Sequence, residues 1–303
     1  FGDVSWNYEA DKGRIIFTCS GEIPDFTQGS PAPWNAYISD IQTIEAEHVT
    51  KIGNYAFQNA VKLLRLKTGE QLQKIGDYAF ADCSKLIYLD IAAVEEIGVS
   101  AFCNNSSIKE CLDLEKVSSI GAGAFAGCST LTDITLGAHL TALEENVFAG
   151  CFALSGFMIP EHVSAIGSNA LKDCTSLRTI NIPASVQNIG AQSFAGNTQL
   201  QKVYFYGGVP GNWAADSFIN CNNSLILYYR TSQEGWSQLG DSWNNVPIQG
   251  QDQFYTERED HYSFGNVASS FGYSPDYCIP RQRYVDVLDS IINGTYYYAI
   301  NEG

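Results

Sequence analysis

Basic residues are scarce in this sequence of 303 residues. Lys and Arg together number 17 against 33 Asp and Glu, which gives a formal net charge of −16 at pH 7. Nucleic-acid binding depends on clustered Lys and Arg that neutralise phosphates, and anionic membrane surfaces attract basic segments. The charge balance therefore argues against nucleic acid and against an anionic lipid surface as partners.

Several motifs are missing as well. No run of 18 apolar residues occurs, so we expect no membrane-spanning segment. The sequence has no Cys-x-x-Cys pair, no His-Glu-x-x-His, no Gly-x-Ser-x-Gly and no glycine-rich phosphate loop. Such motifs mark structural zinc sites, metallopeptidases, serine hydrolases and nucleotide-binding enzymes. We therefore expect no enzyme, no cofactor and no metal site.

The sequence is instead dominated by a repeat, which is the feature that decides the fold of such a chain. Ile-Gly, a large apolar residue, a Cys or small residue and a Leu-rich stretch recur in that order, as in Ile75-Gly76, Phe80, Cys83 and Leu86. The gaps between successive large apolar residues are 23, 22, 23, 23, 23, 23 and 24 residues. These residues are Phe57, Phe80, Phe102, Phe125, Phe148, Leu171, Phe194 and Phe218.

Each unit of this length is too short to close its own core, so neighbouring units must stack and share one. Within a unit, Leu-x-x-Leu-x-Leu predicts a short strand whose first, fourth and sixth residues point inward. Ile-Gly-x-x-Ala-Phe predicts a turn, in which Gly supplies a backbone angle that other residues resist, followed by a tight helical segment. The predicted fold is an α/β leucine-rich-repeat solenoid of about eight coils, with parallel strands and short helical or 3-10 segments.

The consensus unit Val-x-x-Ile-Gly-x-x-Ala-Phe-x-x-Cys-x-x-Leu-x-x-Ile-x-Ile-Pro resembles the BspA-like leucine-rich repeats of bacterial surface proteins. The resemblance covers about residues 45–229 and departs from the pattern at Asn105, which replaces the Cys, and at Trp213, which replaces the Ile. It implies a right-handed solenoid, adhesion or host interaction, and a place outside the cytoplasm, on the cell surface or secreted. Since the chain opens at Phe1 and its one methionine is Met158, we expect that a targeting segment has been lost from it.

The two ends of the repeat predict three further segments. Residues 1–44, with Trp6 and Trp34, are similar to the segment that opens many secreted proteins of the same group, and we interpret them as an amino-terminal cap. The solenoid then spans 45–229, and 230–250 form its carboxy-terminal cap. Residues 251–303 lack the period. Helical spacing over Pro280–Asn293 and a strand pattern over Thr295–Ile300 predict a small α+β unit there.

About residues 262–300 also resemble the stretch that precedes the catalytic His in the streptopain-like cysteine peptidases. The matching residues include Phe271-Gly272-Tyr273-Ser274 and Tyr298. No His follows them, and no catalytic Cys segment is recognisable. The resemblance therefore implies a truncated or degenerate peptidase-related fragment, which is kept as an alternative function.

The nine cysteines predict a buried ladder more than a disulfide framework. Five of them occupy one position of the repeat, three residues after the large apolar residue, where a thiol behaves as a small hydrophobe. Whether Cys103 and Cys111 pair is left open. His139 and His162 share a repeat position and would lie about 5 Å apart on neighbouring coils. A metal site there lacks further ligands, so a polar turn position is the favoured interpretation.

The outward positions of the predicted strands are the candidate binding surface. An open sheet keeps carboxylates in water with ordinary pKa values, so catalysis there is not expected, and a merely solvated surface is the alternative. The candidate partner-binding residues are Arg65, Lys67, Tyr88, Asp90, Asp113, Asp133, Thr135, Met158, Arg178, Asn181, Lys202 and Tyr204.

The sequence thus favours a monomeric, non-catalytic binding protein. It would present an extended surface to a protein, an extracellular-matrix component or another host-surface ligand. Two alternatives remain at this point. One is an enzyme whose chemistry lies in the carboxy-terminal tail, and the other is a structural spacer.

Overall fold

The computed structural model describes residues 5–18, 20–109 and 111–252. The described residues all belong to one compact unit. Except for residues 251 and 252, the predicted α+β unit at 251–303 and the stretch that resembles peptidases lie outside the described residues.

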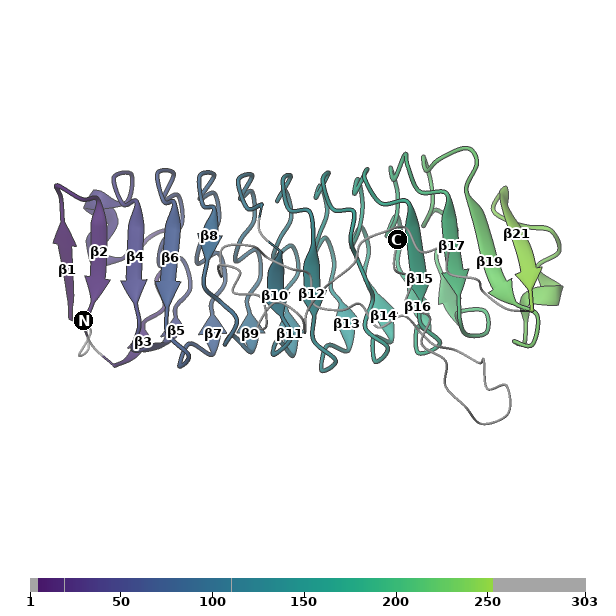
Figure 1. Cartoon of the computed structure of the whole chain (residues 1–303), viewed down its shortest axis with the longest axis horizontal. Coiled ribbons are helices and arrows are strands. Elements are labelled where there is room, and N and C mark those ends of the chain that lie inside the picture. Colours follow the sequence, from purple (N-terminus) through teal and green to yellow (C-terminus); the bar gives the residue numbers. More distant parts are fainter. Residues whose placement is uncertain (1–4, 19, 110, 253–303) are drawn as a thin grey trace, which may run out of the picture. The chain divides into compact units, whose positions relative to one another are not determined.

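Each coil of the repeat contributes to two strand faces, and coils are numbered 1 to 8 by their large apolar residues, from Phe57 to Phe218. We call the face built from the Leu-x-x-Leu-x-Leu stretches the Leu face (Figure 1). Its strands are β1 (Trp6–Glu9), β2 (Arg14–Phe17), β4 (Thr43–Ala46), β6 (Arg65–Thr68), β8 (Tyr88–Leu89), β10 (Leu112–Leu114), β12 (Ile134–Leu136), β15 (Thr179–Ile182), β17 (Lys202–Phe205), β19 (Ile226–Arg230), β21 (Val246–Gln251) and β20 (Ser242–Trp243).

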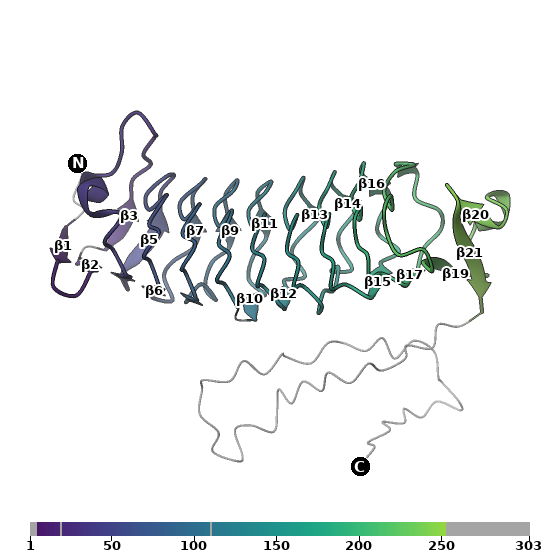
Figure 2. The ribbon, with the colours of Figure 1, turned by 90° about the horizontal axis from the view of Figure 1, so that it is seen from above.

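The second face is built around the Ile-Gly positions, and we call it the Ile-Gly face. Figure 2 shows its strands following one another in the same order as those of the Leu face. They are β3 (Gly21–Ile23), β5 (Val49–Ile52), β7 (Lys74–Ile75), β9 (Glu96–Ile97), β11 (Ser119–Ile120), β13 (Ala142–Leu143), β14 (Ala165–Ile166), β16 (Asn188–Ile189) and β18 (Asn212–Trp213).

Parallel pairing between successive coils confirms the predicted solenoid. Ile44 lies opposite Leu66, and Leu66 lies opposite Leu89, so equivalent inward residues follow one another along the Leu face. The same holds on the Ile-Gly face, where Ile52 lies opposite Ile75. Ile44, Leu66, Ile52 and Ile75 are buried and Leu89 is partly buried against them, which is how short units share one core.

The predicted helical segment of each coil is instead a series of turns. In coil 2, Tyr78 and Asp82 adopt left-handed backbone angles (φ 54° and 62°). The N–H groups of Tyr78, Phe80 and Asp82 donate to carbonyl oxygens of coil 3 at 2.9, 2.8 and 2.8 Å. Because these donors serve the next coil, they are not free for the bonds of a helix. In the described part of the chain, short 3-10 helices occur at η1 (Pro33–Tyr37) and η2 (Trp236–Gln238), both outside the repeat.

The role predicted for the Ile-Gly glycine is also wrong. Gly76 does not have a left-handed φ. A Cβ atom at Gly76 would lie 2.6 Å from the backbone N of Asn54 in the preceding coil, and one at Gly98 would lie 2.6 Å from the backbone N of Asp77. Glycine is therefore needed here because the coils approach each other closely, and not because the turn demands an unusual backbone angle.

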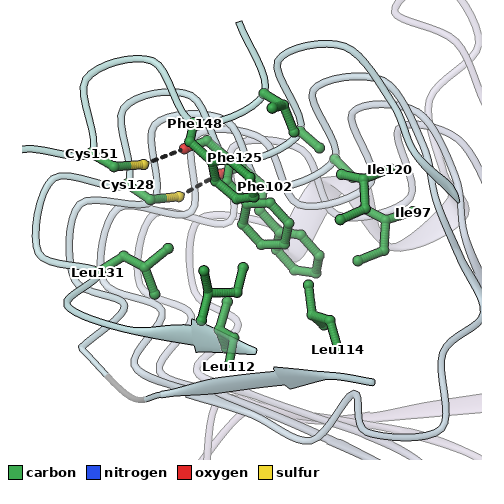
Figure 3. Close-up of a cluster of buried hydrophobic side chains, with 14 of the residues drawn as sticks. Ile97, Phe102, Leu112, Leu114, Ile120, Phe125, Cys128, Leu131, Phe148 and Cys151 are labelled. Atoms are coloured by element: carbon green, nitrogen blue, oxygen red, sulfur yellow. Dashed lines mark hydrogen bonds between the residues drawn. The ribbon is translucent and has the colours of Figure 1, made fainter. Parts of the chain in front are cut away.

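A column of aromatic rings runs through the core. Phe57, Phe80, Phe102, Phe125 and Phe148 stack in sequence, with ring centroids 5.4 to 5.8 Å apart and planes within 15° of parallel. Figure 3 shows Phe102, Phe125 and Phe148 of this column. All five side chains are fully buried. Offset stacking of this kind adds to the stabilisation that burial alone gives.

The column changes character after coil 5. Leu171 occupies the next position, and Phe157 from the strand stretch of coil 5 packs edge-on against Phe148, with centroids 5.3 Å apart. Phe194 and Phe218 then resume the stack at 5.0 Å.

The cysteine ladder is confirmed, and it has a backbone role that the sequence did not reveal. Cys128 donates from Sγ to the carbonyl of Phe102 at 3.2 Å, and Cys151 donates to Phe125 at 3.3 Å (Figure 3). Where Asn replaces Cys, its side-chain amide takes over, so that Asn105 donates to Phe80 at 2.9 Å. The same contact recurs for Cys83, Cys174, Asn197 and Cys221.

These thiols have low nucleophilic reactivity. Burial raises the pKa of Cys83 to about 12 and the pKa of Cys221 to about 11, and it raises the pKa of Cys128 and Cys151 strongly. The nucleophilic thiolate is therefore suppressed. Cys103 carries a free, half-buried thiol, so its pairing with Cys111, left open by the sequence, is not formed in this structure.

Residues before the first coil close its exposed core and backbone. Trp34 is buried, stacks on Phe57 at 5.4 Å and donates from Nε1 to the carbonyl of Ala56 at 2.8 Å. The N–H of Phe26 donates to the carbonyl of Asn54 at 2.9 Å. These contacts cover one end of the first coil, and the amino-terminal cap at 1–44 and the carboxy-terminal cap at 230–250 remain predictions.

Coil 5 interrupts the Leu face. Between β12 and β15, Asp133 and Gly156 form a single isolated bridge. Among the described residues, no backbone hydrogen bond involves Phe157, Met158 or Ile159. The neighbouring strands on either side are regularly paired. Together with a second break between β8 and β10, this interruption divides the described strands of the Leu face into three hydrogen-bonded blocks.

Amide hydrogen exchange tests this interruption. We expect the amides of Phe157–Ile159 to exchange at least about tenfold faster than those of Lys202–Phe205, which are paired on both sides in β17. The measurement is exchange on the intact chain with mass-spectrometric readout. Equal protection of the two segments would contradict the unpaired coil.

Removing one thiol tests the role of the cysteine ladder. Cys151→Ala removes one of two donors to the buried carbonyl of Phe125, which also accepts from the N–H of Cys128 at 3.1 Å, so the free energy of unfolding should fall by about 0.5–1.5 kcal/mol. The matched control is Cys103→Ala, which removes a half-buried thiol outside the ladder. Denaturant unfolding measures both variants, and equal losses for the two would refute the proposed hydrogen-bonding role.

Candidate functional site

Parallel register places the predicted site residues in two rows on the Leu face. Arg65 lies opposite Tyr88, and Thr179 lies opposite Lys202, in what we call the first row. Asp113 lies opposite Thr135, and Asn181 lies opposite Tyr204, in the second row, two residues further along each strand. Because strands in a sheet are about 4.8 Å apart, each row places side chains at regular intervals. Lys67, Asp90 and Met158 belong to the second row, and Asp133 belongs to the first.

Most of these side chains reach solvent. Tyr88 and Met158 are 44% and 37% exposed. Tyr204 differs, because its ring is buried and stacks on Tyr228 with centroids 5.0 Å apart. The exposed residues are Arg65, Lys67, Tyr88, Asp90, Met158, Arg178 and Asn181, and the half-buried ones are Asp113, Asp133, Thr135 and Lys202.

The amino-terminal end of the Leu face neutralises its own charges. Arg14 contacts Glu9 at 2.6 Å and Glu45 at 3.0 Å. Hydrogen bonding to Arg14 lowers the pKa of Glu9. Lys67 pairs with Glu47, while the guanidinium of Arg65 lies 4.5 Å from the centroid of the Tyr88 ring. Charges in this region are therefore largely engaged within the chain.

The middle of the face is acidic. Asp90, Asp113 and Asp133 lie on coils 2, 3 and 4. Partial burial raises the pKa of Asp90, so the expectation that every carboxylate of this open sheet keeps its ordinary pKa is wrong at this position. Asp113 accepts a hydrogen bond from the N–H of Glu115 at 3.1 Å. Among the described residues, Asp90 and Asp113 form no salt bridge.

The carboxy-terminal end of the face is basic and aromatic. Arg178 and Lys202 lie on coils 6 and 7, and Arg230 ends β19 on coil 8. The guanidinium of Arg230 lies 5.0 Å from the centroid of the Tyr206 ring. The sequence analysis missed Tyr206, Tyr228 and Arg230 in this region. Extending the two rows by one repeat of 24 residues, to coil 8, would have found Tyr228.

The Ile-Gly face carries a shallow groove of about 190 Å³ near its amino-terminal end. Lys51 pairs with Asp25 at 3.1 Å, and Lys74 pairs with Glu96 at 2.6 Å, so both lysines of the groove are paired with carboxylates. The lining residues are Glu22, Thr50, Lys51, Gln73, Lys74, Glu95 and Glu96.

Residues 5–18, 20–109 and 111–252 contain neither a metal-binding cluster nor a membrane-spanning helix. No three His, Cys, Asp or Glu side chains among those residues are grouped in a way that would hold a metal ion. His139 and His162 are both exposed. In the same part of the chain, no helix has the length and apolar character needed to cross a bilayer.

Comparison with solved structures gives leucine-rich repeat proteins. A protein of Bacteroides ovatus is 21% identical over 83% of this chain and 76% of its own, with a TM-score of 0.47. One of Eubacterium ventriosum is 19% identical over 77% of each chain, with a TM-score of 0.43. A leucine-rich cell surface protein of Faecalibacterium prausnitzii is 22% identical over 84% of this chain and 94% of its own, with a TM-score of 0.40.

No curated protein matches the chain. The family model of the BspA type leucine-rich repeat region does match, with six copies over residues 36–115 and 96–224. The matched residues make up more than half of the sequence, and they coincide with the coils described above. The chain therefore belongs to the family of proteins with BspA-type leucine-rich repeats.

Proposed function

We propose that this protein is a non-catalytic binding module that presents its Leu face to a protein or matrix partner outside the cytoplasm. The observation that carries the proposal is the in-register pair of outward rows on paired strands of successive coils. Side chains held on paired strands need little ordering on binding, so less conformational entropy opposes association.

The composition of the face supports protein recognition over catalysis. Exposed Tyr88 lies beside the Arg65 guanidinium, and Tyr and Arg are the residue types enriched at energetically important interface positions. Met158 adds an exposed, adaptable apolar side chain near the middle of the face. Arg178 and Asn181 add polar contacts on the next coil.

The proposed location depends on the family. BspA-like repeats are typical of bacterial surface proteins, and this chain belongs to that family. The strong net negative charge, −16 at pH 7, suits a solvent-exposed protein that does not bind nucleic acid. The buried, protonated thiols are compatible with an oxidising environment because they resist oxidation.

Capture of a partner by the Leu face tests the proposal. The intact protein is immobilised and exposed to purified matrix proteins and to host-cell surface extracts, and bound proteins are identified by mass spectrometry. We expect Tyr88→Ala combined with Arg178→Ala to weaken capture of any enriched partner at least about tenfold.

The matched control is Gln73→Ala combined with Glu95→Ala on the Ile-Gly face, which removes exposed side chains from the opposite set of strands. This control should retain full binding. A control that loses as much binding as the Leu-face variant would refute the proposed surface. A second control variant has the outward residues of its Leu face scrambled. If the unmodified chain captures no protein in larger amount than this variant does, the binding function itself is refuted.

A further inference from the structure

Charges on the Leu face are sorted by coil. Coils 2, 3 and 4 carry Asp90, Asp113 and Asp133, whereas coils 6, 7 and 8 carry Arg178, Lys202 and Arg230. Coil 5 lies between the two groups, and its outward residue in the second row is Met158, which is uncharged and 37% exposed. The face therefore has an acidic half and a basic half on either side of a neutral centre.

This pattern is complementary to itself. A two-fold axis that runs parallel to the strands through coil 5 brings two Leu faces together and reverses the order of the coils. The rotation leaves the position of each residue along the strand direction unchanged, so each outward row of one copy faces the same row of the other. Coils 2, 3 and 4 of one copy then face coils 8, 7 and 6 of the other, so each acid meets a coil that carries a base. Met158 of one copy faces Met158 of the other.

The side chains have the reach that this alignment requires. In this dimer, Asp113 of one copy faces Tyr204 of the other, and Lys202 lies two residues before Tyr204 on the same strand. Each of the other two bases likewise lies within two residues of the position that faces its acid. Two residues of strand span about 6.6 Å, and the long, flexible stems of Lys and Arg cover such an offset. Lys109, an exposed base beside the acidic half, lies seven residues after Phe102, as Gln201 lies seven after Phe194, so by this repeat position it faces a neutral residue.

We infer that the Leu face mediates self-association of this protein as an isologous, antiparallel dimer with coil 5 at its centre. This inference shares the surface of the proposed function but does not require a heterologous partner. It replaces the monomer that the sequence predicts. In the dimer, acidic and basic halves contact each other twice, because the interface is symmetric.

The size of the face sets the expected strength. Seven coils at about 4.8 Å and roughly five residues of strand at about 3.3 Å give on the order of 500 Å² for each copy. That is smaller than the roughly 800 Å² that each partner buries in a typical specific complex. We therefore expect a weak dimer, with a dissociation constant on the order of 10–100 µM at low salt.

Sedimentation analysis of the intact chain measures this equilibrium over concentrations up to about ten times that constant. Because the attraction is between exposed and half-buried charges at the protein surface, raising the ionic strength from about 0.05 M to about 0.5 M should weaken the dimer by roughly tenfold. A chain that stays monomeric over this range at low salt would overturn the inference, and so would a dimer that tightens with salt.

A charge exchange tests the antiparallel geometry. Asp113→Lys and Lys202→Asp each place like charges opposite each other twice, so each variant alone should dimerise at least about tenfold more weakly. Mixed in equal amounts, the two variants restore both opposite-charge contacts, and a heterodimer of near-original affinity should form. The control is Lys109→Asp, a matched reversal opposite an uncharged residue, which should dimerise as the unmodified chain does.

Circular dichroism spectra confirm that each variant retains its fold before it is compared. Failure of the mixture to recover association would overturn the antiparallel arrangement. The outcome is separable from the proposed function: a monomer whose Leu-face variant still loses its captured partner refutes self-association alone. A salt-sensitive dimer that passes the charge exchange supports the inference even when no partner is captured.

Discussion

The whole structure depends on one constraint, which is that no coil can satisfy its core or its backbone alone. In most coils, the Phe of a unit of about 23 residues stacks on the Phe of a neighbouring coil. Its turn donates N–H groups forward to the following coil, and its Cys or Asn donates a hydrogen bond backward to the preceding one. Stability is therefore a property of contacts between neighbours.

The same constraint organises the surface. In-register parallel strands convert sequence positions one period apart into rows of side chains about 4.8 Å apart. The chemistry of the Leu face can then be described coil by coil, as charges that are compensated at the amino-terminal end, acids, a neutral coil, and finally bases with aromatics. In a repeat fold, the charge pattern of a large surface therefore follows directly from the order of residues in the sequence. This pattern supports both binding proposals.

Much of this could be predicted from sequence. The period placed the Phe column, the inward Leu and Ile positions and the buried thiols, because spacing of equivalent residues fixes what stacks on what. It also placed Arg65 beside Tyr88 and Thr179 beside Lys202. These relations need only the repeat length and the alternation of side chains along a strand.

Other features were decided by tertiary contacts. Spacing alone did not show that Tyr78 donates to the next coil in place of forming a helix, or that Gly76 is required by the closeness of Asn54. It did not reveal the unpaired strand stretch of coil 5 or the burial of Tyr204 against Tyr228. A sequence pattern specifies which residues are equivalent, whereas distances between coils follow from packing of whole neighbouring coils, which no single unit contains.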